Sequence, residues 1–144
     1  MSNIHQQLLQ DCLILGRFPL SHLLLFNDAN YPWFILVPNR DDISEIYQLS
    51  EVDQQQLIRE SSLLCRMLAE QFEADKMNVA ALGNMVPQLH IHHVVRYRDD
   101  VAWPAPVWGA ELAKSYSDVG LQQVIKKLRV GLDEIVEFSW SELG

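Results

Sequence analysis

The chain has 144 residues, of which 49% are hydrophobic, so it is long enough to bury one core and gives no reason to divide it into several domains. Its 19 acidic and 11 basic residues give a formal charge of -8, which argues against a broad nucleic-acid-binding surface. A small anionic ligand in a local cationic pocket remains compatible with this charge. We expect a single domain over residues 1–144, with a core at about 13–98 followed by an aromatic, proline-containing loop and a helix in 99–144.

The two cysteines, Cys12 and Cys65, stand alone on apolar stretches without CxxC spacing. We therefore expect reduced, buried thiols and a cytoplasmic protein, and we rank a structural disulfide below that reading. The first ten residues lack a basic region followed by an apolar run, and no window has the roughly 18 apolar residues that a membrane span needs. The sequence predicts neither export nor membrane insertion.

The first third of the chain reads as a short helix followed by strands. Apolar residues recur at helical spacing within 4–12, which predicts a short opening helix. Two apolar runs, 13–18 and 21–26, predict neighbouring strands, and the second ends in the turn-forming residues 27–30. The run 33–37 is apolar throughout, so we expect a central strand that is covered on both faces of its sheet.

A long helix is predicted to begin after Ser50, because Ser50 and Asp53 have the spacing of a helix N-cap. Its apolar stripe is expected to pack on the sheet and contains Leu57, Leu64, Leu68 and Phe72, supported by Val52, Ile58 and Met67. The polar positions include Gln54, Gln55, Arg59, Glu60 and Glu70.

The second half contains two further strands, a loop and a helix. Residues 77–82 read as a strand, and Gly83 and Asn84 form a turn that leads into a histidine-rich strand. The aromatic and proline-rich stretch 103–109 should be a stiff loop rather than a strand. An amphipathic pattern that starts at about Asp118 predicts a closing helix.

Residues 88–95 hold three of the five histidines of the chain. If they form a strand, alternation sends Gln88, His90 and His92 out of one face. Such a row is poor core material, because each imidazole needs hydrogen-bond partners and titrates near neutral pH. We expect it on the floor of a cleft. His93 faces the other side, where packing or a subunit contact is the expected role.

These residue types suit nucleophilic chemistry at phosphorus. A partly unprotonated imidazole can attack through one ring nitrogen while the other donates to a fixed acceptor, and His90 is the best placed. His92 and Gln88 could orient it or donate to a leaving oxygen, and Asn84 could hold an anionic group for in-line attack. The chain has no GxSxG elbow, P-loop or GxGxxG, which argues against serine hydrolases, nucleotide triphosphatases and dinucleotide oxidoreductases.

Alternative interpretations exist for the histidines and the turn. His90 and His92 at i and i+2 could be two ligands of a zinc or iron site, although no third ligand lies at a suggestive spacing. They could also be core histidines with satisfied hydrogen bonds. Asn84 could supply turn geometry alone, but its position just before the histidines favours a phosphate contact.

The other candidates also have two readings. Asn27 and Asp28 are turn formers, and a contact with a nucleotide ribose is the alternative role. Arg98 is expected to be a solvated charge, and Arg96 stays open as a phosphate anchor. The loop 103–108 is expected to pack through its tryptophans, or else to cap a nucleotide base or cross a dimer interface.

The row resembles the signature of the histidine-triad (HIT) superfamily of nucleotide hydrolases and transferases, which is His-x-His-x-His followed by two apolar residues. The resemblance covers roughly residues 23–98. It puts Gln88 at the first histidine, His90 at the middle one and His92 at the third. Gly83 and Asn84 stand where many members carry Gly-Gln.

Further positions match the family or depart from it. Arg96 falls where the family often has a Pro-Arg ending, and residues 26–38 look like its earlier pair of strands, where an Asn or Asp contacts the ribose. The departures mark a divergent branch: Gln88, His93 at an apolar position, Val95 in place of proline and Trp33 in place of glycine.

The resemblance implies a mechanism and an assembly. The middle histidine, here His90, would attack the α-phosphorus of a nucleotide and form a nucleotidyl-histidine that water or another acceptor resolves. The members most similar in outline are diadenosine-polyphosphate hydrolases, and two sheets would join in a homodimer. The resemblance implies no particular cofactor. A divalent cation such as Mg²⁺ could accompany the substrate.

The sequence thus predicts an α+β fold, with an antiparallel sheet of about five strands, one long helix packed on it and short helices at both ends. Because Gln88 cannot shuttle a proton, a catalytically weak nucleotide-binding module is the competing hypothesis.

Overall fold

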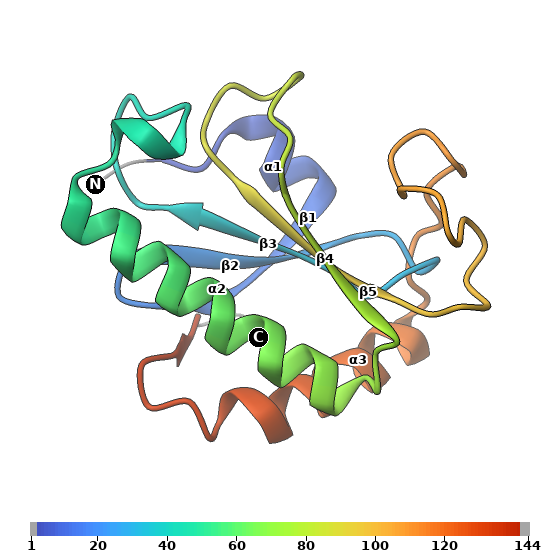
Figure 1. Ribbon diagram of the computed structural model, residues 1–144. Helices are drawn as coiled ribbons and strands as arrows, with labels where there is room; N and C mark the ends of the chain where they lie inside the picture. Colours follow the sequence, from blue (N-terminus) through green and yellow to red (C-terminus); the bar gives the residue numbers. More distant parts are fainter. Residues whose placement is uncertain (1–2, 142–144) are drawn as a thin grey trace.

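The computed structural model describes residues 3–141 and shows an α+β architecture (Figure 1). The strands are β1 (Cys12–Arg17), β2 (Ser21–Phe26), β3 (Trp33–Pro38), β4 (Lys76–Ala81), β5 (Ile91–Arg96) and β6 (Ser139–Trp140). The helices are α1 (Gln6–Asp11), the long α2 (Glu51–Gln71) and α3 (Asp118–Leu132), with a short 3-10 helix at Ile46–Gln48. All strand pairs are antiparallel, in the order β4-β5-β3-β2-β1-β6. The predicted fold class is confirmed.

The sheet is covered on both faces, with β3 near its centre. All six residues of β3 are buried, as its uniformly apolar sequence predicts. Phe34 and Leu36 pack into one apolar cluster with residues of α2 and α3, whereas Trp33 and Ile35 pack into a second cluster with Leu8 of α1. Figure 1 shows α2 and α3 on one side of the sheet and α1 on the other. Alternation along the strands thus creates two cores.

The sheet has six strands rather than about five. The additional strand, β6, has two residues and pairs with Gly16 and Arg17 at the edge of β1. It comes close because Gly16 has no side chain: a Cβ at Gly16 would lie 2.1 Å from the Ser139 carbonyl oxygen. A strand of two residues is too short to give an alternating pattern, so the sequence does not reveal it.

The long helix α2 begins as predicted, and part of its predicted stripe is wrong. The Ser50 hydroxyl accepts a hydrogen bond from the Asp53 N–H at 3.1 Å. Leu57, Leu64, Met67, Leu68 and Phe72 are buried. Val52 and Ile58 are 75% and 64% exposed, because the sheet contacts a narrower strip of the helix than the apolar residues occupy.

Glu60 was assigned to the polar face of α2, but its side chain is fully buried. Its carboxylate accepts hydrogen bonds from the main-chain N–H groups of Leu20 and Ser21, at 2.8 and 3.0 Å, and from the Gln56 amide at 2.8 Å. Glu60 therefore satisfies donors at the turn between β1 and β2. Glu60 lies on the same stripe of the helix as its apolar neighbours three and four residues away. Its charge favours the polar face, but its hydrogen bonds to the main chain allow it to be buried.

Other predicted elements shift by a few residues at most. The strand predicted at 77–82 is β4, and α3 begins at Asp118 with the Ser117 hydroxyl as its N-cap. Helix α3 ends at Leu132, and Val136, four residues beyond that end, is 98% exposed. Residues 103–109 form no strand, as predicted.

Both cysteines are free thiols, and both are half-buried rather than fully buried. Burial raises the pKa of Cys12 to about 12, and it also raises the pKa of Cys65. Within residues 3–141, no helix combines the length and the apolar content that crossing a membrane requires.

Candidate active site

His90 lies immediately before β5 with its protonation pattern fixed by the main chain. Its Nδ1 is 2.7 Å from the carbonyl oxygen of Gln88. A carbonyl oxygen can only accept, so Nδ1 carries the hydrogen and Nε2 carries the lone pair. The imidazole is 5% exposed and therefore firmly held. This is the arrangement that a nucleophilic imidazole requires.

A cavity of about 310 Å³ opens in front of His90. Its walls are formed by Ser44, Glu45, Ala81, Gly83, Asn84, Pro87, Gln88, Leu89 and His90. A Cβ at Gly83 would lie 3.7 Å from the His90 Cε1, so the glycine brings main chain close to the ring. Asn84 is exposed and its side chain makes no hydrogen bond within the described residues, which leaves its amide available to a ligand. A second cavity of about 650 Å³ shares Ser44, Pro87 and Gln88 with the first.

The Gln88 side chain does not stand beside the two histidines. The strand predicted from Gln88 begins only at Ile91, and the Gln88 amide turns to the segment before α1. Its Oε1 accepts from the His5 N–H at 2.7 Å, and its Nε2 donates to the Asn3 carbonyl at 2.9 Å. Gln88 therefore orients His90 through its main-chain carbonyl, while its side chain holds the main chain of Asn3 and His5 in place.

His92 is held as the opposite tautomer beside His90. The Trp33 indole N–H donates to His92 Nδ1 at 3.0 Å, so the hydrogen of His92 is on Nε2. Within residues 3–141 this buried Nε2 has no hydrogen-bond partner of normal geometry, although the main chain of Leu82 is close enough to favour the protonated ring. The His90 and His92 ring centroids are 4.9 Å apart. His92 thus offers an unused donor next to the nucleophile candidate.

Trp108 of the proline-rich loop packs against the histidine row. The Trp108 ring meets Trp33 and His92 edge to face, with centroid distances of 5.6 and 5.1 Å. Packing against the histidine row is thus the role that the structure shows for this tryptophan, in the same apolar cluster as Phe26.

His93 points to the opposite face, as alternation predicts. Its Nδ1 donates to the Ile91 carbonyl at 3.0 Å, and its Nε2 accepts from the Ser61 hydroxyl of α2 at 2.7 Å. Burial lowers the pKa of His93 to about 4. Burial, with help from the neighbouring His90, also lowers the pKa of His92 to about 4.

Acid should destabilise the fold through these two rings. Their pKa values are about 4 in the folded chain and 6.5 by reference, so the unfolded chain binds more protons between these values. The free energy of unfolding is therefore expected to be fully retained above pH 6.5 and to fall as the pH drops toward 4. Urea unfolding at several pH values measures the slope, and NMR should show neither His92 nor His93 titrating above pH 5. Titration of either ring near pH 6.5 would contradict this assignment.

Asn27 and Asp28 lie at the other end of the sheet from His90. The strand registers pair Leu36 with Ile91 and Leu25 with Phe34, which places the two groups at opposite ends of β3. The Asn27 Oδ1 accepts from the Tyr116 N–H, at 2.9 Å. The buried Asp28 Oδ1 accepts from the N–H groups of Asn30 and Lys114, at 3.0 and 3.2 Å.

Through their Oδ1 atoms both side chains hold the segment that leads into α3, as residues of a turn do. Neither residue lines the cavity at His90, and the ribose contact stays a prediction.

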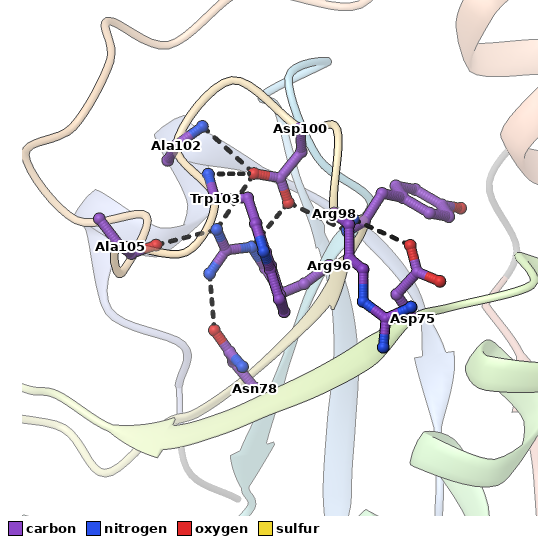
Figure 2. A network of polar contacts seen from close by, with 9 residues as sticks. Asp75, Asn78, Arg96, Arg98, Asp100, Ala102, Trp103 and Ala105 are labelled. Carbon is purple, nitrogen blue, oxygen red and sulfur yellow. Dashed lines mark hydrogen bonds and ion pairs between the residues drawn. The ribbon is translucent and has the colours of Figure 1, made fainter.

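Arg96, considered as a phosphate anchor, is a structural residue (Figure 2). Its side chain is 1% exposed and forms a two-pronged ion pair with Asp100, at 2.8 and 3.1 Å. It also donates to the Asn78 side chain and the Ala105 carbonyl, and it lies over the rings of Tyr31 and Trp103. Because Arg96 is buried and its side chain makes four hydrogen bonds inside the protein, these contacts assign it to holding the fold. Arg98 is exposed, as expected.

The histidines do not form part of a recognisable metal centre. Within residues 3–141, no group of three or more His, Cys, Asp or Glu side chains is arranged to hold a metal ion. His90 and His92 each have one ring nitrogen bonded to the protein, and residues 3–141 supply no third ligand of the kind that the metal hypothesis needs.

Comparison with known proteins gives a consistent family. The HIT domain family profile matches residues 7–99. A histidine triad protein of Marinobacter aquaeolei VT8 is 48% identical, with a TM-score of 0.90 over 94% of this chain and 99% of that one. Histidine triad proteins of Bradyrhizobium japonicum and Sinorhizobium meliloti 1021 are 46% and 35% identical, with TM-scores of 0.87 and 0.86, each over 90% of this chain and 96% of that one. No functionally curated protein matches this chain. The chain belongs to the HIT domain family.

Proposed function

We propose that this protein hydrolyses nucleotides at the α-phosphate, or transfers the nucleotidyl group, with His90 as nucleophile and dinucleoside polyphosphates as the leading substrate class. The observation that carries the proposal is the His90 tautomer: Nδ1–H is bonded to the Gln88 carbonyl, which leaves the Nε2 lone pair for attack. HIT family membership supports a nucleotide substrate.

The reaction has two steps. In the first, His90 Nε2 forms a bond to the α-phosphorus, the bond to the leaving phosphate oxygen breaks, and the leaving group departs with the electron pair. In the second, water attacks the same phosphorus and loses a proton to the solvent, the P–N bond breaks with its electron pair returning to His90 Nε2, and the mononucleotide is released. Asn84 and the main chain at Gly83 line the cavity where the phosphate oxygens would sit. His92 Nε2–H, which lacks a hydrogen-bond partner within the described residues, is a donor on a ring whose centroid is 4.9 Å from that of His90.

The competing candidate is a nucleotide-binding module with little catalysis. One observation favours it: the Gln88 amide is bonded to the N-terminal segment, and an amide carries no exchangeable charge at neutral pH. The position that holds a histidine in the family signature therefore gives no acid or base to the reaction.

A trapping experiment separates the two candidates. The protein is mixed with a dinucleoside polyphosphate labelled at the α-phosphate and quenched within milliseconds in alkali, where a phosphorus–nitrogen bond to histidine survives. We expect label on the wild-type protein and on Gln88→His, and none on His90→Ala. Measurable nucleotide binding without label on the wild type would sink the covalent mechanism and leave the binding module.

We also propose that two copies form a homodimer through β4. This strand is at the edge of the sheet, and Val79, Leu82 and Met85 in and after it are 50%, 37% and 92% exposed. An open strand edge beside exposed apolar side chains invites pairing with a second strand. Sedimentation of the full chain should give a dimer, and Val79→Lys should give a monomer. A wild-type monomer at micromolar concentration would reject this assembly.

We place the protein in the cytoplasm. Both cysteines are free, and burial keeps their thiol pKa values high, which suits a reducing compartment. Cell fractionation tests this, and recovery in an exported fraction would contradict it.

A further inference from the structure

A large cavity lies at the other end of the molecule from His90. It has a volume of about 920 Å³ and lies between α3, the end of α2 and the residues that follow β5. Tyr97 in its wall is seven residues beyond His90 along an extended chain, which corresponds to roughly 20 Å. The two cavities share no lining residue. Whatever this cavity binds is therefore separate from the histidine chemistry.

The cavity is positively charged in a strongly acidic protein. The chain has four lysines, and three of them, Lys114, Lys126 and Lys127, line this cavity. No Asp or Glu is among its lining residues, although the chain contains 19 of them. Within residues 3–141 none of the three lysines forms an ion pair, so their charges are available to an anion. Three of the eleven basic residues of the chain thus gather around a cavity that has no acidic residue in its lining.

Helix α3 adds to this potential. The N-cap Ser117 and Gly120 of its first turn line the cavity, whereas Asp118 in the same turn is not among the lining residues. The positive end of a helix dipole favours negative charge at this position. Ser117 and the three lysines therefore line the same cavity.

The remaining wall is aromatic and firmly anchored. The Lys127 ammonium lies over the Phe72 ring, 5.3 Å from the ring centroid. The Tyr97 hydroxyl donates a hydrogen bond to the Phe72 carbonyl. The Tyr116 N–H is bonded to Asn27. Flat rings beside lysines match a compound that has both an aromatic body and an anionic group.

We propose that this cavity is a second ligand site that binds an organic phosphate of nucleotide size, with its phosphate or pyrophosphate at Lys114, Lys126 and Lys127 and its apolar body against Phe72 and Tyr97. The volume lies in the range of small-molecule sites. The proposal does not depend on catalysis at His90.

The test uses NMR titration of the full-length protein with AMP and with pyrophosphate, following the amide of Gly120 for this cavity and that of Gly83 for the one at His90. We expect saturable shifts at Gly120, with AMP binding more tightly than pyrophosphate. The double variant K126Q/K127Q should weaken both ligands by about tenfold or more, since each charged hydrogen bond contributes that order of free energy.

K76Q is the matched control, because Lys76 is the fourth lysine, lies outside the cavity and donates to the Met77 carbonyl. It should bind both ligands as the wild type does. Equal affinities of K126Q/K127Q and K76Q, or an unmoved Gly120 signal in the wild type, would overturn the proposal. AMP binding no more tightly than pyrophosphate would overturn the assignment of an organic ligand.

Discussion

Replacing His90 with glycine is expected to lower kcat for mononucleotide release by roughly 10³-fold or more, because it removes the cavity-lining imidazole whose Nε2 is the proposed nucleophile. His92 cannot substitute for it. The Nδ1 of His92 already accepts the Trp33 indole hydrogen, and its Nε2 carries a hydrogen instead of a lone pair. Steady-state assays with a dinucleoside polyphosphate measure this loss.

Chemical rescue makes the test specific for the imidazole. Added imidazole should enter the space left in His90→Gly and restore part of the rate, while the wild type should not respond. Asn84→Ala is the comparison variant within the same cavity. It should retain covalent labelling but react more slowly, because it loses one phosphate contact. A His90→Gly variant with near wild-type turnover would show that the nucleophile is elsewhere.

Much of the fold could be predicted from local patterns. The uniformly apolar run of β3 predicted a strand covered on both faces, and the structure places Phe34 and Ile35 in the two different clusters. Ser50 predicted the first residue of α2 because an N-cap hydrogen bond spans three residues. Such features depend on neighbours in sequence, so the sequence reveals them directly.

The side-chain contacts that the sequence did not predict depend on partners far away in the chain. Gln88 bonds to residues 83 and 85 positions before it, and Asp28 to a residue 86 positions after it. Glu60 meets its N–H donors about 40 positions away. No local pattern shows such partners. Each of these side chains therefore looked like a ligand group or a surface charge until the fold was known.

In the candidate site, too, short-range contacts could be predicted from the sequence and long-range contacts could not. The tautomer of His90 depends on a carbonyl two residues before it, and a motif can indicate this because the distance in sequence is short. The tautomer of His92 depends on Trp33, which lies 59 residues away. The family signature identified the histidines, whereas their hydrogen positions required the structure.

Arg96→Met is expected to lower the free energy of unfolding by about 3–5 kcal/mol, the usual cost of removing one partner from a buried ion pair. The variant leaves the Asp100 carboxylate buried, and it leaves the Asn78 side chain and the Ala105 carbonyl without their donor. It also frees the loop that this arginine holds against the sheet (Figure 2). Urea unfolding measures the loss.

Arg66→Met is the matched control, because Arg66 also pairs with an acid four residues later, Glu70, but both side chains are exposed, at 83% and 63%. This variant should cost less than about 1 kcal/mol. The contrast isolates burial as the cause, since residue type and spacing are the same. Equal losses for Arg96→Met and Arg66→Met would show that burial of the ion pair contributes nothing.

The pH dependence of the Arg96→Met loss provides an independent check. Burial alone would raise the pKa of Asp100, but hydrogen bonds from Arg96 and from the Tyr97 N–H hold it below its usual 3.8. The stability that the pair contributes is therefore present above pH 3.8 and is lost as the pH falls through the lowered pKa. In Arg96→Met the carboxyl loses its cation and protonates more readily, so the difference between wild type and variant should shrink in acid. A difference that stays constant from pH 7 to pH 3 would mean that Arg96 acts by packing alone.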